Sequence, residues 1–333
     1  MKLCSRLGSA PLAVVVVLIA SWQVTLRSED PNGVNLVQVL NIVNGTGGDL
    51  SQYRVLSYYL AVALQGLLGL TNPPFDELRF GQCVLIFGLA YVLYGQLGLR
   101  PRTRLLGIGL LTGLISLSLG RLGPSTFSLD RFTDTIFYLI AALLVLRGRV
   151  LWIPPLMVLA VANRETSVFI PTLILARYFP VTRLFTDRRW RAPLFAAIAA
   201  WAIAAVVYFG IHAYYGPRPR TEESYFGTAM VLRSLSMPAQ TTFFFAMTSL
   251  LPIAALLSLK DADPFLRRLF WLVVPLWFAI HIWAARLGEG IMYLAPTTII
   301  IVPLVLQGLE RRLTPAEPRA AEAFGRPLPH PQG

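Results

Sequence analysis

The sequence predicts an all-α protein that crosses a membrane about ten times. Of its 333 residues, 55% are hydrophobic and only 14% are charged. A water-soluble domain carries roughly 25% charged residues to cover its surface. Because the deficit of charge extends along the whole chain, we expect lipid to be the solvent for most of the surface.

Apolar segments of the length that a bilayer needs recur along the chain. A spanning helix takes about 20 mostly apolar residues. The first segment follows Lys2 and Arg6 as a secretory signal would, but no small-residue cleavage site precedes Arg27. We therefore expect an uncleaved membrane helix there. The predicted spans are residues 9–27, 81–99, 105–120, 133–147, 150–163, 166–180, 193–214, 241–259, 269–286 and 291–309.

The apolar segment 55–70 decides on which side of the membrane every later loop lies. If it lies on the outer surface and the other ten segments cross, the cytoplasmic parts hold 19 Lys and Arg against 6 acids. The outer parts then hold 10 against 11. Because cytoplasmic loops favour Lys and Arg, we predict an interfacial helix at 55–70 and two cytoplasmic termini.

The chain is predicted to form one transmembrane domain over residues 1–310. Within it, residues 28–80 make a long outer loop with interfacial helices. Residues 311–333 are rich in Pro, Ala and Arg. This composition is typical of a disordered tail, which we place in the cytoplasm.

Composition and motifs also exclude several kinds of chemistry. The net charge of +12 would suggest nucleic-acid binding in a soluble protein. Here the basic loops account for it, so we expect membrane lipids and no nucleic acid as partners. The sequence has no Cys/His zinc spacing, no phosphate-binding loop and no G-x-S-x-G element.

Ionisable residues gather on the predicted outer face. Charged side chains at membrane depth cost roughly 2.5–3.5 kcal/mol each, so they persist where they are paired or functional. Asp134 and Arg164 could form a structural ion pair, and Glu29 and Asp30 could be a solvated helix end. The outer-face candidates are Glu29, Asp30, Asp49, Tyr53, Arg54, Arg131, Asp134, Arg164, Glu165, Arg286 and Tyr293.

An enzyme that faces outward has no nucleotide sugar, but it can use a donor activated by a lipid phosphate. Glycosyl transfer from such a donor needs a carboxylate base and cations that hold the departing phosphate. Asp30 leaves the first span at the membrane surface and is the first choice for the base. The predicted phosphate-binding cations are Arg54, Arg131, Arg164 and Arg286.

Short motifs follow one another in a suggestive order along the outer segments. The acidic pair Glu29–Asp30 precedes an amphipathic segment, VNLVQVLNIVNG, and then Gly48–Asp49. An aromatic-rich segment, YRVLSYYLAVALQGLLG, comes before the second span. Arg131 and Asp134 lie in RFTD at the entry of a span. Downstream come NRETSVFIP and then Arg286, with Tyr293, Leu294 and Pro296.

This layout resembles the C-type glycosyltransferase (GT-C) superfamily, including bacterial aminoarabinose-type lipid A transferases and protein O-mannosyltransferases. The resemblance implies a GT-C-like helical bundle in a bacterial inner (plasma) membrane and a polyprenyl-phosphate sugar as donor. It implies catalytic roles for Asp30, Glu29 and Asp134. The other outer-face candidates would bind the substrates: Asp49, Tyr53, Arg54, Arg131, Arg164, Glu165, Arg286 and Tyr293.

Several questions stay open at the level of sequence. The sugar and the acceptor are not identified, and neither is a divalent metal that would help to hold the phosphate. Asp134 beside Arg131 is placed to orient the acceptor or such a metal. A transporter or flippase of lipid-linked saccharide, or a polymerase or ligase of surface polysaccharide, is the alternative. A transporter would carry charges on both sides of the midplane, whereas here they cluster on one face.

Overall fold

The computed structural model confirms the all-α class. It contains no strand among the residues that it describes. These residues are 9–27, 34–47, 52–119, 129–178, 190–217, 227–228, 231–232, 236, 250–284 and 290–313.

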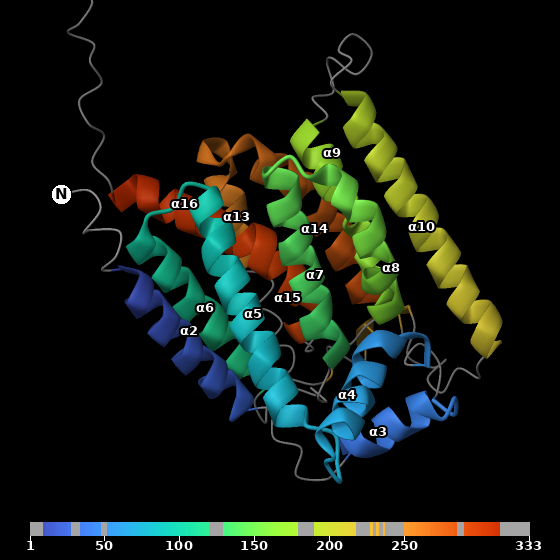
Figure 1. Ribbon diagram of the computed structural model, residues 1–333. Coiled ribbons are helices and arrows are strands. Elements are labelled where there is room, and N and C mark those ends of the chain that lie inside the picture. Colours follow the sequence, from blue (N-terminus) through green and yellow to red (C-terminus); the bar gives the residue numbers. More distant parts are fainter. Residues whose placement is uncertain are drawn as a thin grey trace, which may run out of the picture.

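The first two thirds of the bundle is a row of helices that run side by side with alternating direction (Figure 1). Loops 97–100 and 147–149 lie at one end, and residues 26–27, 69–74 and 164 lie at the other. The helices of this row are α2 (Ser9–Thr25), α5 (Phe75–Gln96), α6 (Pro101–Leu119), α7 (Leu129–Leu146), α8 (Ile153–Asn163), α9 (Thr172–Tyr178) and α10 (Arg191–Tyr215).

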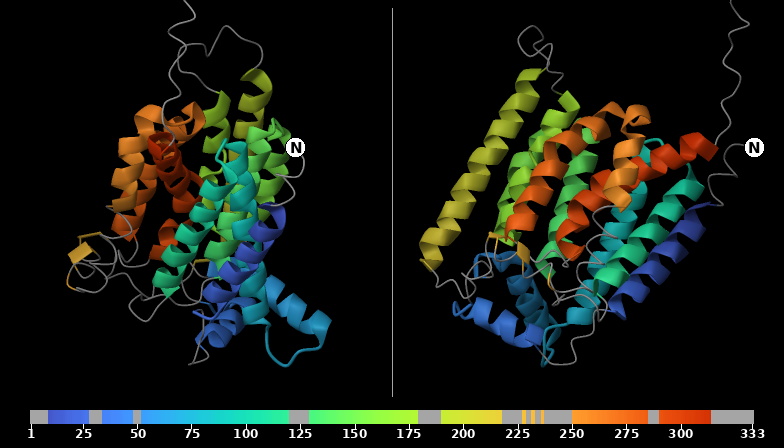
Figure 2. Two further views of the ribbon diagram at one scale, coloured as in Figure 1. Left: turned by 90° about the vertical axis from the view of Figure 1, so that its left-hand side faces the viewer. Right: turned by 180° about the vertical axis from the view of Figure 1, so that it is seen from behind.

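The C-terminal segments form a second layer behind α7 and α8, coloured orange to red in Figures 1 and 2. In the last helical stretch, Ile291–Leu313, 89% of the most apolar part is buried inside the protein, whereas in α10 the share is only 22%. The last stretch is therefore core, and α10 lies at the rim. The segments are α13 (Leu251–Ser258), η7 (Leu259–Asp261), α14 (Pro264–Ala284), η8 (Gly290–Tyr293), α15 (Leu294–Pro296), η9 (Thr297–Ile301) and α16 (Val302–Leu313).

A π-helical turn, η9 (Thr297–Ile301), lies shortly before Pro303 in the last helical stretch. Pro303 has no N–H, so the carbonyl of Thr298, five residues earlier, cannot receive the π-type hydrogen bond. The hydroxyl of Tyr94 on α5 donates to this carbonyl at 2.9 Å instead. A side chain from another helix thus completes the backbone hydrogen bonding of the core helix.

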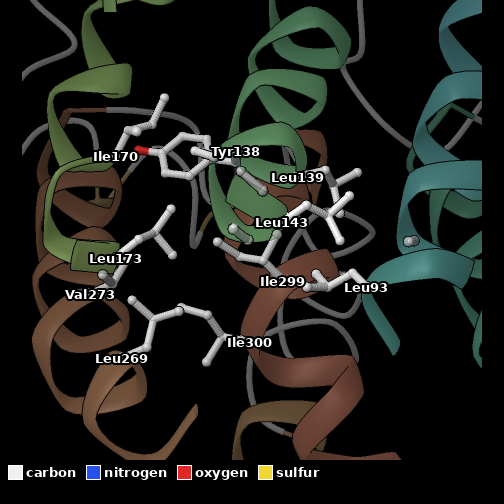
Figure 3. Close-up of a cluster of buried hydrophobic side chains, with 14 of the residues drawn as sticks. Leu93, Tyr138, Leu139, Leu143, Ile170, Leu173, Leu269, Val273, Ile299 and Ile300 are labelled. Carbon is white, nitrogen blue, oxygen red and sulfur yellow. The ribbon is translucent and has the colours of Figure 1, made fainter. Parts of the chain in front are cut away.

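Apolar side chains from distant parts of the chain meet in the core (Figure 3). Leu143 of α7, Leu173 of α9, Leu269 of α14 and Ile300 of η9 belong to one buried cluster. Large apolar residues also cover the outside of α10: Phe195, Ile198, Val206 and Phe209 are exposed. Such an exposed apolar surface is expected where lipid is the solvent.

Among the residues that the structure describes, five helices are long and apolar enough to cross a membrane. They are Phe75–Gln96, Pro101–Leu119, Arg191–Tyr215, Pro264–Trp283 and Ile291–Leu313. This finding agrees with a multi-pass membrane protein but does not confirm the predicted count of ten. At 1.5 Å per residue, the 11 residues of α8 extend only about 16 Å, which is shorter than a hydrocarbon core of about 30 Å.

The predicted interfacial segment forms a short helix, α4 (Val55–Leu68), of 14 residues. With α3 (Val34–Val43) it lies across one end of the bundle, below α7 and α8 in Figure 1. We call this the α3–α4 end. A helix of this length extends about 21 Å, so it is too short to cross upright.

The opposite end of the bundle, which we call the basic end, carries most of the cationic loops. Its acids among the described residues are Asp261, Asp263 and Glu310. This distribution is the one that the positive-inside rule gives to a cytoplasmic face. The basic residues there are Arg100, Arg102, Arg104, Arg147, Arg149, Arg177, Arg191, Lys260, Arg267, Arg268, Arg311 and Arg312.

Candidate functional site

Four charged side chains meet where the loop before α4, the start of α7 and the turn after α8 converge. Asp130 is the centre: its Oδ2 accepts a hydrogen bond from Arg164 Nη1 at 2.9 Å and lies 3.5 Å from Arg54 Nη1. Arg54 also binds Glu165 with two hydrogen bonds, Nε to Oε2 at 3.0 Å and Nη2 to Oε1. We call Arg54, Asp130, Arg164 and Glu165 the charged network.

A helix break places two of these residues. Helix α8 ends at Asn163, and Arg164 is extended, with φ −162° and ψ 139°. The chain then re-enters a short 3-10 helix, η3 (Glu165–Phe169). This break turns Arg164 toward Asp130, in the first turn of α7, where a helix N-terminus stabilises a negative charge.

Neutral polar side chains hold the surrounding helices together. Asn163 Nδ2 donates to the backbone carbonyl of Asp130 at 2.7 Å, and Ser57 of α4 donates to Asn163 Oδ1. The hydroxyls of Ser57 and Thr133 lie 2.9 Å apart, and Gln82 of α5 donates to Thr133 at 2.8 Å. Four helices are thus fixed around the charged network.

Asp134, predicted to orient an acceptor or a metal, is buried one turn further along α7. Its two oxygens accept hydrogen bonds from the hydroxyls of Thr166 at 2.8 Å and Ser167 at 2.6 Å. Tyr138 donates to the backbone carbonyl of Thr166 at 2.6 Å. The contacts of Asp134 therefore fix η3, and with it the position of Glu165.

Arg79 is a cation that the sequence analysis assigned to the long outer loop. In the structure Arg79 lies in the second turn of α5, which begins at Phe75, and it is fully buried. Its guanidinium carbon is 3.6 Å from the centroid of the Phe132 ring, a cation–π distance.

Tyr53 anchors the loop before α4 to the rim helix α10. Its ring stacks on His212 with centroids 3.7 Å apart and an interplanar angle of 19°. Its hydroxyl donates to the carbonyl of Gly216 at 2.9 Å. The ring of Tyr208 lies 4.0 Å from that of His212. Three aromatic rings thus stand in a row beside Glu165.

A cavity of about 390 Å³ opens between η3, α10 and α14. Its walls are almost entirely apolar, and Glu165 is the one residue of the lining that carries a charge. A smaller pocket between Tyr53, Ile211 and His212 shares Val161, Glu165 and Tyr208 with it. The larger cavity is lined by Val161, Glu165, Thr166, Val168, Phe169, Trp201, Ala204, Ala205, Tyr208 and Ile280.

Electrostatics keep Glu165 ionised. Glu165 lies outside the five helices that could cross a membrane. Its half-buried position raises the pKa of its carboxyl, but the positive charges of Arg54 and Arg164 outweigh this effect and hold the pKa at about 2. The carboxylate therefore bears a charge at neutral pH.

Of the remaining predicted site residues, two lie in the part of the chain that the structure describes and four lie outside it. Arg131 is half-buried in the first turn of α7. Tyr293 is buried, stacks on Phe278 at 4.7 Å, and follows Met292, whose sulfur accepts a hydrogen bond from Arg164 Nη2 at 3.3 Å. Four predicted residues lie outside the described part of the chain: Glu29, Asp30, Asp49 and Arg286.

The structure brings together three predicted residues, Arg54, Arg164 and Glu165, and adds partners that the sequence analysis did not select. Asp130 carried a usable signal, because it lies four residues before Asp134 and so on the same face of a helix. Asn163, Ser57 and His212 carried none, since a lone polar residue on an apolar helix is common. No group of three His, Cys, Asp or Glu suited to a metal lies among the described residues.

The described residues thus form an all-helical protein with five helices able to cross a membrane and a charged network at one end. Comparison of the chain with protein-family models, curated proteins and solved structures gives no match.

Proposed function

We propose that this protein is a membrane glycosyltransferase of the GT-C type that uses a polyprenyl-phosphate-linked sugar. Its active site would lie at the α3–α4 end, on the outer face of a bacterial plasma membrane. The observation that carries the proposal is the apolar cavity whose wall contains Glu165, together with the ion pair that Glu165 forms with Arg54. A lipid-borne anion needs an apolar channel and a cation in this order.

The cavity suits a hydrocarbon chain. It lies between α10 and α14, two helices that could cross a membrane. Trp201 of α10 has its indole N–H bonded to the carbonyl of Val168 at 3.0 Å, so its apolar ring forms a fixed wall. An isoprenoid chain in this cavity would exchange bilayer contacts for protein contacts without exposing apolar surface to water.

The cations of the charged network suit a phosphate. A guanidinium presents paired N–H donors in a plane, and this geometry matches phosphate oxygens as it matches a carboxylate. The Arg54 side chain is 15% exposed, whereas that of Arg164 is 4% exposed. Arg54 is therefore the proposed contact to the donor phosphate, and Arg164 supports it through Asp130.

Asp30 remains the proposed base, with Glu29 as its neighbour. Deprotonation of the acceptor hydroxyl by a carboxylate typically contributes 10²–10⁴-fold to the rate. Arg131, Asp49, Arg286 and Tyr293 remain proposed substrate contacts.

A transporter of lipid-linked saccharide would use a similar cavity. The buried charged side chains favour an enzyme. Among the described residues, Arg79, Asp130, Asp134 and Arg164 are buried. They lie near the start of α5, at the start of α7 and directly after α8, and α7 and α8 both contact α4. Alternating access would need charged groups on both sides of the membrane midplane.

The proposal is tested with purified protein, a radiolabelled polyprenyl-phosphate sugar and a membrane extract as acceptor. We expect transfer of label to the extract, and a loss of at least about 100-fold in Arg54→Gln, because the phosphate loses a charged donor pair. Arg102→Gln, the same change at an exposed position of the basic end, is the matched control. Movement of intact donor across a vesicle membrane without transfer would instead identify a transporter.

A further inference from the structure

Glu165 is the acid of the charged network that reaches open space. Its side chain is 31% exposed and lines both the large cavity and the small pocket. The other two carboxylates near it, Asp130 and Asp134, are 2% and 3% exposed and have partners in the fold.

The position of Glu165 on Arg54 is that of an anionic ligand. Its two carboxylate oxygens accept hydrogen bonds from Nε and Nη2 of the guanidinium. This pair of donors is one that can bind a phosphate bidentately. The remaining nitrogen, Nη1, faces Asp130 at 3.5 Å. A phosphate that arrives through the cavity therefore finds the outward donors of Arg54 already occupied.

We propose that Glu165 takes the place of the ligand phosphate on Arg54 in the empty protein, and that an anionic lipid headgroup binds by displacing it. The inference rests on the proposed function for the identity of the lipid. Glu165 then competes with the ligand within the protein. It keeps the guanidinium of Arg54 oriented, and it lowers the affinity of Arg54 for every other anion.

This arrangement makes the site selective by charge. The network holds two cations, Arg54 and Arg164, and two anions, Asp130 and Glu165, so it is neutral before the ligand arrives. A phosphodiester adds one negative charge. A phosphomonoester, the lipid product of glycosyl transfer, carries about −1.5 to −2. The displaced carboxylate remains nearby on η3, so it repels the product more than the donor and favours product release.

The test measures binding of decyl phosphate, a single-chain phosphomonoester, to the full-length protein in detergent. Removal of the competitor in Glu165→Gln should tighten binding by roughly tenfold. Arg54→Gln should weaken it by at least tenfold. Glu165→Asp, which keeps the charge on a shorter arm, should lie between the wild type and Glu165→Gln.

The control is Glu77→Gln, which removes an exposed acid in the first turn of α5 at the same end of the bundle. It should leave binding within twofold. Inorganic phosphate should bind far more weakly than decyl phosphate, because it makes no use of the apolar cavity. Equal binding of the two would overturn the assignment to a lipid headgroup.

A merely structural Glu165 gives the opposite result. If the carboxylate only positions Arg54, its removal should weaken decyl phosphate binding, and this outcome sinks the inference. The measurement needs neither sugar nor acceptor. If the transfer assay fails and Glu165→Gln still tightens binding, the proposed function is wrong and this inference stands. If transfer succeeds and Glu165→Gln weakens binding, the proposed function stands and this inference is wrong.

Discussion

At the scale of single residues, Asp130 organises the charged network. It is buried and faces two guanidinium groups, of which Arg164 is equally buried. A buried cation that loses its carboxylate partner is strongly destabilising, whereas a surface pair is worth little.

Asp130→Asn should therefore lower the free energy of unfolding by about 3–5 kcal/mol, because Arg164 keeps its charge in a buried position. Thermal unfolding of the purified variant measures this change. Glu77→Gln, at an exposed position, should shift the midpoint very little. A stable Asp130→Asn protein would mean that water reaches Arg164.

The pH dependence of stability reports on Glu165. Its pKa is lowered from 4.5 to about 2 in the folded protein. A group with a lowered folded pKa contributes stability that is complete above its unfolded pKa and is lost as the pH falls. The stability advantage of the wild type over Glu165→Gln should thus be constant above about pH 5 and vanish between pH 4.5 and 2. An advantage that persists at pH 2 would contradict the ion pair with Arg54.

At the scale of elements, the short helix η3 positions the site because three side chains hold it against α7. Thr166 and Ser167 bind Asp134, and Tyr138 binds the carbonyl of Thr166. A kinked segment inside a membrane protein persists where neighbouring side chains satisfy its polar groups. The break after Asn163 is such a segment.

Ser167→Ala removes one donor from the buried Asp134 and should cost about 1–3 kcal/mol of unfolding free energy. It should also tighten decyl phosphate binding, because η3 carries the competing Glu165 and holds it on Arg54. Thr112→Ala is a fair comparison, since the Thr112 hydroxyl binds only the carbonyl of Ile108 in its own helix. If the two changes had equal effects on stability and on decyl phosphate binding, the contacts of η3 with Asp134 would not position the site.

The cavity gives a second prediction at this scale. Ala205 of α10 lines it, so Ala205→Trp should fill part of the channel and reduce kcat/KM for the lipid donor by about tenfold. Ala202→Trp adds the same ring to an exposed position three residues earlier, outside the cavity lining. Transfer kinetics with donors of decreasing chain length should show that the loss shrinks as the chain shortens. An equal loss at every chain length would place the lipid elsewhere.

At the scale of the whole molecule, charge separates the two ends of the bundle. The basic end carries the arginine-rich loops, and the α3–α4 end carries Asp130, Glu165 and their partners. Under the positive-inside rule the basic end would be cytoplasmic and the charged network outside, and this orientation stays a prediction.

Cysteine labelling tests the orientation in intact cells. In a variant without Cys4 and Cys83, Asn72→Cys at the exposed α3–α4 end should react with a membrane-impermeant maleimide. Arg102→Cys at the basic end should react only after permeabilisation. Labelling of position 102 in sealed cells would invert the topology and place the charged network in the cytoplasm.

The sequence by itself indicated that lipid surrounds most of the chain, and it gave the approximate positions of several helices. The predicted segment 105–120 corresponds to α6, and 193–214 corresponds to α10. In lipid every backbone N–H and C=O must be paired locally, so an apolar run of sufficient length becomes a helix whatever surrounds it. Helix α5 begins at Phe75, six residues before the predicted span 81–99, and its first turn contains Asp76 and Glu77.

Only the tertiary structure decided which of these helices touch and what they enclose. Arg54, Asp130 and Glu165 belong to three segments far apart in the chain, and no spacing rule predicts that they meet. The apolar cavity is lined by Ala204 and Ala205 of α10 together with residues of η3. Helix association in lipid lacks the hydrophobic drive that acts in water and rests on shape and on a few polar pairs, and such pairings leave no periodic pattern in the sequence.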